Sequence, residues 1–253
     1  MFMRIILPAV FFLLVLSIST QACQPEFYFL FRDEARTRLD SLNASPSKDN
    51  IFDRFILMHN LAFHKYKKMR EDAEKLARTF IPDSTGKDIF NAYKGSLKMI
   101  QVSQSKIGTK ILKSINPLTS SPIEEARKGF KIICDAVEKD PDNRILRCLR
   151  VTAATESAEH LPEMFNYARN DLEWLDSCVA PSDSIAMFFV NLNWAKYYYK
   201  LGRKRKHTGF IRQAHQSIAR AGEYACTPVY SSWATEWKNK IEKNIKDTKS
   251  DEN

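Results

Sequence analysis

Apolar residues recur every three or four positions along most of the chain, the spacing that places them on one side of an α-helix. The stretch 50–80 shows this pattern at Ile51, Phe55 and Met58. It predicts either one long helix or two helices joined near Lys67. No stretch shows the alternation of apolar and polar residues that is typical of a half-buried strand.

The same spacing predicts the rest of the fold. It indicates helices over residues 24–43, 87–104, 123–139, 160–178, 181–202, 207–224 and 229–246, and one that starts near residue 144. Segments rich in proline or serine at 45–49 and 114–122 read as loops. The chain has only 7 glycines, which favours helices joined by short turns over strands and phosphate-binding loops. We therefore expect an all-α protein of about nine helices.

A proline interrupts the apolar pattern between residues 136 and 154. The helix that ends near Lys139 cannot continue through Pro141, because the proline ring has no N–H and clashes with the preceding turn. Asp142 or Asn143 can cap the next helix by accepting from its free N–H groups. This stretch is expected to form two amphipathic helices folded back on each other.

The segment DAVEKDPDN (Asp135–Asn143) resembles the end of a tetratricopeptide repeat, with Ala136 and Pro141 in the positions of that motif. NWAKYYYKLG (residues 193–202) resembles a second, degraded unit. His207 departs from the motif, since a small alanine belongs there. The resemblance implies antiparallel helical hairpins stacked as a short tetratricopeptide-like array.

A broader resemblance covers roughly residues 70–205. NAYKGSLKMI (91–100), GFKIICDAVEKDPDNRILRCLR (129–150) and LPEMFNYARNDLEWL (161–175) follow one another as in an uncharacterised group of exported, tetratricopeptide-like helical proteins of Bacteroidetes type, some possible lipoproteins. This resemblance implies a fold and export, and it implies no activity.

The amino end is typical of a secretory signal peptide over residues 1–22. Arg4 precedes an apolar run, Ile5–Ile18, that is too short to span a membrane. Cys23 follows the small-residue site directly, as the lipidated cysteine of a bacterial lipoprotein does. The alternatives are cleavage with release, or an uncleaved anchor. We expect one helical domain over 23–246 and a polar tail over 247–253.

Four further cysteines follow the signal, and none forms a C-x-x-C pair. Cys134 and Cys148 lie seven residues either side of Pro141, so a hairpin would bring them level, and an exported protein permits a disulfide between them. The alternative is two reduced cysteines at the edge of the core, because packed helix axes stand further apart than most disulfides reach.

The formal net charge is +9, and cations and carboxylates alternate along most of the chain. The tightest basic run is KLGRKRKH (200–207). It could meet anionic head groups, and otherwise it is a solvated turn between helices. The candidate anionic-surface residues are Lys200, Arg203, Lys204, Arg205 and Lys206. Nucleic acid is an implausible partner for an exported chain.

No catalytic, cofactor or metal motif is found, and the histidine spacing suits no metal site on one helix. We interpret Arg144, Arg147 and Arg150 as a solvated flank of their helix, with an anion site as the alternative. Asp171 and Asp176, with the neighbouring Glu173, also read as solvated. The aromatic residues of 188–199 read as core, with one or two lining a groove.

The leading hypothesis is an exported, membrane-tethered or released scaffold that binds a protein or peptide and is not an enzyme, located in the periplasm or cell envelope. The second is an envelope accessory protein that holds a small ligand in a pocket between helices. An enzyme without local motifs is the third.

Overall fold

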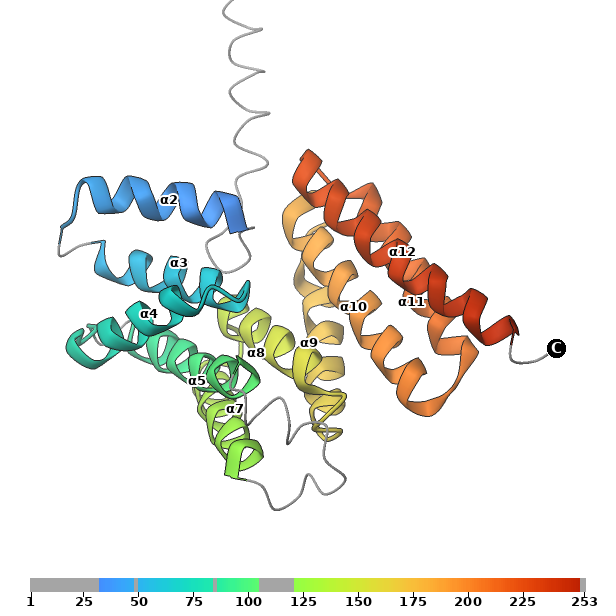
Figure 1. The fold of residues 1–253 in the computed structure, drawn as a ribbon, viewed down its shortest axis with the longest axis horizontal. Helices are drawn as coiled ribbons and strands as arrows, with labels where there is room; N and C mark the ends of the chain where they lie inside the picture. The colour runs from blue at the N-terminus through green and yellow to red at the C-terminus, as the bar shows by residue number, and fades with distance from the viewer. Residues whose placement is uncertain (1–31, 48–49, 84–85, 105–120, 251–253) are drawn as a thin grey trace, which may run out of the picture. The chain divides into compact units, whose positions relative to one another are not determined.

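The computed structural model describes residues 32–47, 50–83, 86–104 and 121–250 (Figure 1). The predicted signal peptide and Cys23 lie outside these ranges. Ten helices and no strand occur within them: α2 (Arg32–Ala44), α3 (Ile51–Phe63), α4 (Lys67–Thr79), α5 (Lys87–Gln104), α7 (Ser121–Lys139), α8 (Arg144–Ser157), α9 (Met164–Cys178), α10 (Ser184–Arg205), α11 (Thr208–Glu223) and α12 (Pro228–Ser250). The prediction of an all-α chain built from consecutive helical pairs is confirmed.

The stretch 50–80 consists of two helices, α3 and α4. Lys65, just after α3, takes the left-handed conformation with φ of 71°. Its N–H donates to the carbonyl of Ala62, and the N–H of Tyr66 donates to the carbonyl of Leu61. These two bonds form a Schellman-type cap, which ends α3 and reverses the chain without a glycine.

The turn at Pro141 forms as the sequence predicts. α7 ends at Lys139, and the side-chain oxygen of Asn143 accepts from the backbone N–H of Leu146 at 3.2 Å. Asn143 is thus the cap of α8. Asp183 caps α10 in the same way, since its Oδ1 accepts from the N–H of Ala186 at 3.0 Å.

The described residues divide into two compact units. The amino-terminal unit holds the described residues up to Leu175 together with Arg203–Lys206. The carboxyl-terminal unit holds Asp176–Gly202 and the described residues from His207 onward. One apolar core cluster, which includes Phe55, Phe90 and Tyr93, lies wholly within the amino-terminal unit.

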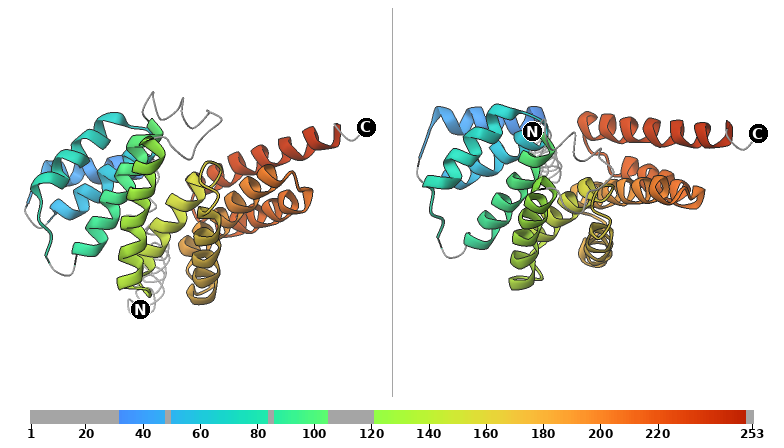
Figure 2. Two further views of the ribbon diagram at one scale, coloured as in Figure 1. Left: turned by 90° about the horizontal axis from the view of Figure 1, so that it is seen from below. Right: turned by 60° about the horizontal axis from the view of Figure 1, so that its bottom comes forward.

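The amino-terminal unit is a stack of helix pairs around one core. α2 packs on α3, α3 on α4, α5 on α7 and α7 on α8, and α5 and α7 lie side by side in Figures 1 and 2. Phe55, Phe90 and Tyr93 form the aromatic part of this core. Gly95 and Gly129 allow α5 and α7 to touch, because a Cβ on Gly95 would lie 2.5 Å from the carbonyl oxygen of Gly129.

The carboxyl-terminal unit contains the end of α9, α10 as far as Gly202, α11 and α12. Almost every residue of α10 from 185 to 202 is buried, and Phe188 packs on Tyr230 of α12. Gly202 faces Ile211 of α11, whose Cδ1 a Cβ at this position would approach to 2.6 Å. α12 continues to Ser250 through part of the expected tail, because no proline or glycine interrupts it. Within the described part of the chain, no helix is long and apolar enough to cross a membrane.

Candidate functional site

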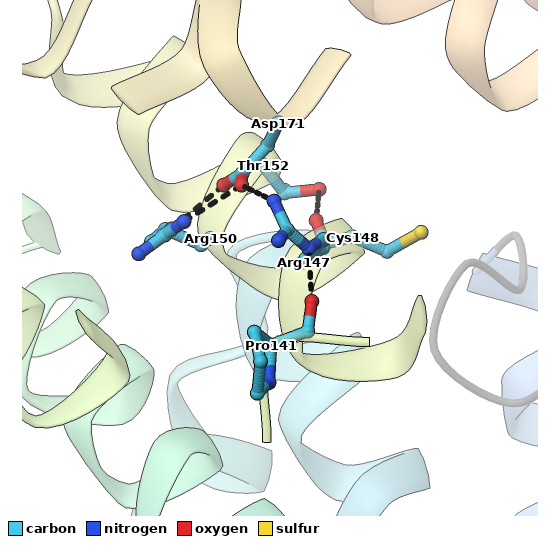
Figure 3. Close-up of polar contacts among 6 residues, drawn as sticks. All are labelled: Pro141, Arg147, Cys148, Arg150, Thr152 and Asp171. Carbon is cyan, nitrogen blue, oxygen red and sulfur yellow. Dashed lines mark hydrogen bonds and ion pairs between the residues drawn. The ribbon is translucent and has the colours of Figure 1, made fainter. Parts of the chain in front are cut away.

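A buried carboxylate holds two arginines between α8 and α9 in the amino-terminal unit (Figure 3). The Asp171 side chain is fully buried. Arg150 donates to both of its oxygens, from Nε and Nη2, at 2.7 Å each. Arg147 donates from Nη1 to Oδ1 at 2.9 Å. The two arginines, one turn apart on α8, thus share a single counter-charge on α9.

An aromatic ring lies against each of these arginines. The Arg147 guanidinium lies 4.3 Å from the ring centre of Trp174, and that of Arg150 lies 5.6 Å from the ring centre of Tyr167. Burial disfavours the charged guanidinium of Arg150, but the hydrogen bonds and charge of Asp171 outweigh burial, so its pKa is raised. We name Arg147, Arg150 and Asp171 the arginine–aspartate cluster.

The cluster corrects two sequence interpretations. Arg150 and Asp171 are not solvated, and the anion beside the arginines is Asp171 itself. The sequence did hold a signal for this: Asp171 lies three residues after Ala168 and four before Leu175, in register with the buried stripe of α9. A carboxylate on a buried face requires cationic partners, and α8 supplies them.

The structure places Cys134 and Cys148 in the core with no disulfide between them. This is the second of the two arrangements that the sequence allowed. Burial raises the pKa of the Cys134 thiol, although Arg150 beside it acts in the opposite direction. Both thiols are buried, and the raised pKa of Cys134 is the opposite of what a reactive cysteine requires.

The predicted basic surface is smaller than the sequence run. Lys200 is only 6% exposed, within α10, and Arg203 pairs with Glu159 at 3.4 Å. Lys204, Arg205 and Lys206 are exposed at the end of α10.

A pocket of about 390 Å³ opens between α10 and α11 in the carboxyl-terminal unit. Its volume falls within the range of small-ligand and side-chain pockets. The lining residues lie on one face of each helix and at the end of α9: Asp176, Met187, Asn191, Trp194, Tyr198, Ser217, Arg220, Glu223 and Tyr224. We name this the α10–α11 pocket.

We name Asn191, Trp194 and Tyr198 the floor of the α10–α11 pocket. Ring stacking and hydrogen bonds fix these side chains in place. The rings of Trp194 and Tyr198 stack at 5.1 Å and 15°, and the Trp194 Nε1 donates to Oδ2 of Asp176 at 2.8 Å. Asn191 is 6% exposed and donates its side-chain N–H to the Met187 carbonyl at 2.8 Å.

The solvent-exposed part of the lining, which we name the rim of the pocket, is charged. Asp176, Arg220 and Glu223 are exposed, and Tyr224 is half-buried. No described residue forms an ion pair with Arg220 or Glu223. The rim therefore presents charges of both signs that the fold itself does not use.

The sequence pointed to only part of this pocket. We interpreted Asp176 as solvated, and its side chain is exposed. We also expected one or two aromatic residues of α10 to line a groove, and Trp194 and Tyr198 line the pocket. The sequence did not single out Ser217, Arg220 or Glu223. A signal existed, because the lining positions 187, 191, 194 and 198 and the positions 217, 220 and 224 both follow helical spacing.

Comparisons with protein-family models, with curated proteins and with solved structures gave no match for this chain. No group of three or more histidine, cysteine or acidic side chains lies close enough to hold a metal ion among the described residues. The α10–α11 pocket, whose lining carries charged side chains at its exposed edge, is the candidate functional site.

Proposed function

We propose that the protein is an exported helical scaffold that binds an extended peptide or a segment of another protein. One side chain of the partner enters the α10–α11 pocket, while the rest of the segment lies over the exposed rim. Stacked helical hairpins commonly act as such scaffolds without covalent chemistry, and the tetratricopeptide-like pattern around Pro141 favours this class.

The observation that carries the proposal is the contrast between floor and rim. Asn191 and Trp194 at the floor are at least nine-tenths buried and fixed by hydrogen bonds. Asp176, Arg220 and Glu223 at the rim are exposed. A rigid floor suits one side chain, and a polar, solvent-facing rim suits a main chain that passes over it.

Pools of octapeptides, each pool with one fixed central residue, test the proposal. We expect at least one pool to shift the indole N–H signal of Trp194 in a saturable way when the purified, ¹⁵N-labelled protein is titrated. If no pool shifts this signal, the proposal is wrong.

A pair of tyrosine variants provides the control. Tyr198→Ala removes half of the stacked floor and should weaken the binding of the responsive pool. Tyr167→Ala, a partly exposed tyrosine of the amino-terminal unit, should leave that binding unchanged. Equal losses in both variants would contradict a role for the pocket.

The volume of the pocket also favours a second function, the binding of a free small ligand. Small-ligand sites usually bury 70–90% or more of their ligand, whereas the rim here is open and charged. This function predicts that a free amino acid binds as tightly as the peptide that contains it. The peptide function predicts that the peptide binds more tightly, because its neighbouring residues also contact the rim.

Export and tethering are a separate part of the proposal, supported by the pattern of residues 1–23. Mass spectrometry of the amino terminus of the protein from the membrane, released and cytosolic fractions tests it. Acylated Cys23 supports a lipid tether, an unmodified terminus near residue 23 supports release, and an intact Met1 in the cytosolic fraction contradicts export.

A further inference from the structure

We infer that the α10–α11 pocket takes a guanidinium group, so that the bound segment carries an arginine at this position. The inference rests on the proposed function of peptide binding and names the side chain that enters the pocket. It follows from the hydrogen-bond capacity, the charge and the aromatic floor of the pocket.

The pocket offers acceptors that the fold leaves without donors. Asp176 uses Oδ2 for Trp194, so Oδ1 remains to accept from an occupant. Asn191 uses its side-chain N–H for the Met187 carbonyl, so its Oδ1 remains, and this amide is more than nine-tenths buried. An acceptor on a largely buried residue of a pocket lining favours an occupant that brings a donor. Glu223 adds a second carboxylate at the rim.

The charge of the lining favours a cation. Asp176 and Glu223 contribute two negative charges and Arg220 one positive charge, which leaves one net negative charge on the lining. A carboxylate or phosphate would gain from Arg220 alone and would be repelled by both carboxylates. A cation gains from two carboxylates and is repelled by one guanidinium.

The aromatic floor selects a planar cation over a compact one. Trp194 and Tyr198 are nearly parallel, and such rings accept a guanidinium by stacking while its N–H groups point outward to acceptors. A guanidinium has five donors in a plane, enough for Asp176 and Asn191 together, whereas a lysine ammonium is a point charge that holds its water more strongly.

Calorimetric titration of the whole protein with three blocked amino acids tests the inference: N-acetylarginine methylamide, its neutral isostere N-acetylcitrulline methylamide, and N-acetylglutamate methylamide. We expect the arginine probe to bind and to shift the Trp194 indole signal. The citrulline probe should bind about tenfold more weakly or not at all, because it keeps the shape and loses the charge. Equal binding of the arginine and citrulline probes, or preferential binding of the glutamate probe, overturns the inference.

Three charge-neutralising variants should change the affinity for the arginine probe in opposite directions. Asp176→Asn and Glu223→Gln should each weaken the binding of the arginine probe roughly three- to tenfold. The side-chain oxygen of asparagine at position 176 can still accept the hydrogen bond from Trp194. Arg220→Gln should strengthen the binding of the arginine probe, because the change removes a positive charge from the rim. Glu236→Gln, an exposed change on α12, is the control and should have no effect. Weaker binding in Arg220→Gln would contradict the inference.

The peptide pools separate this inference from the proposed function. If an arginine-centred pool does not bind and another pool shifts Trp194, the guanidinium assignment is wrong and peptide binding stands. If no pool and no probe shifts Trp194, both are wrong.

Discussion

At the scale of single residues, His59 is the most unusual titratable group of the amino-terminal unit. Its Nε2 lies 2.8 Å from Oγ of Ser96, and its ring meets that of Tyr93 edge-on at 4.7 Å. Its Nδ1 is buried without a hydrogen-bond partner in the described structure. Burial lowers the pKa of His59 to about 3, so the folded protein keeps this ring neutral.

His59 makes the free energy of unfolding depend on pH. Between the ordinary pKa of about 6.5 and about 3, the unfolded chain binds a proton that the folded protein does not. Stability is therefore lost as pH falls below about 6.5, by up to about 1.4 kcal/mol per pH unit from this residue. Urea unfolding of the protein between pH 5 and 7 measures the slope.

His59→Gln keeps a hydrogen-bonding group near Ser96 and does not titrate, so it should flatten that slope although it destabilises the protein at pH 7. His160→Gln, a change at an exposed histidine, is the control. An unchanged slope in His59→Gln would show that His59 is accessible to protons in the folded state.

At the scale of helices, two close contacts fix the amino-terminal unit. The first is the glycine contact of α5 with α7, where Gly95 and Gly129 each leave no space for a methyl group. The second is the arginine–aspartate cluster, which joins α8 to α9 by charge. Both depend on residues whose role becomes visible only when the partner helix is in place.

Gly95→Ala should destabilise the protein by about 1–3 kcal/mol, although alanine favours a helix, because the new Cβ would push α5 away from α7. Gly222→Ala on α11 is the matched control. Nothing lies within 4 Å of the position of its Cβ, so it should stabilise by about 0.5 kcal/mol. Thermal unfolding of both variants measures the difference, and a stabilised Gly95→Ala would contradict the packing of α5 on α7.

Asp171→Asn should destabilise the protein by about 3–5 kcal/mol, because two largely buried arginines would lose their common counter-charge. Glu173→Gln on the same helix removes an exposed carboxylate and should cost less than about 1 kcal/mol. Chemical denaturation compares the two. Similar small losses would mean that water reaches the arginine–aspartate cluster and replaces Asp171.

At the scale of the whole molecule, the net charge of +9 and the proposed tether would bring the protein close to anionic head groups. The exposed cations of the basic run include Lys204, Arg205 and Lys206, and the exposed Arg203 beside them pairs with Glu159. Changing Lys204, Arg205 and Lys206 to glutamate should reduce co-sedimentation with phosphatidylglycerol vesicles several-fold at low salt, and the difference should vanish at about 0.5 M salt.

A triple glutamate variant at Lys67, Lys68 and Lys75 of α4 changes the net charge by the same amount elsewhere on the surface. Equal losses in the two triple variants would show that net charge, and not the basic run, governs attraction to the vesicles.

The helices could be predicted because their causes are local. Pro141 and the cap at Asn143 end one helix and start the next, and the apolar spacing of 123–139 requires only the geometry of a helix. The division of residues 50–80 was left open, because the cap at Lys65 uses a non-glycine residue in a left-handed conformation that the sequence does not mark.

The sequence by itself thus determined the helical class and most helix boundaries, since periodicity and turn chemistry act over a few residues. Only the tertiary structure decided that Asp171 neutralises Arg147 and Arg150, and that α10 and α11 build a pocket with unpaired charges at its rim. The physical reason is that the energy of a charge depends on its burial and its neighbours, and both are set by helices far apart in the chain.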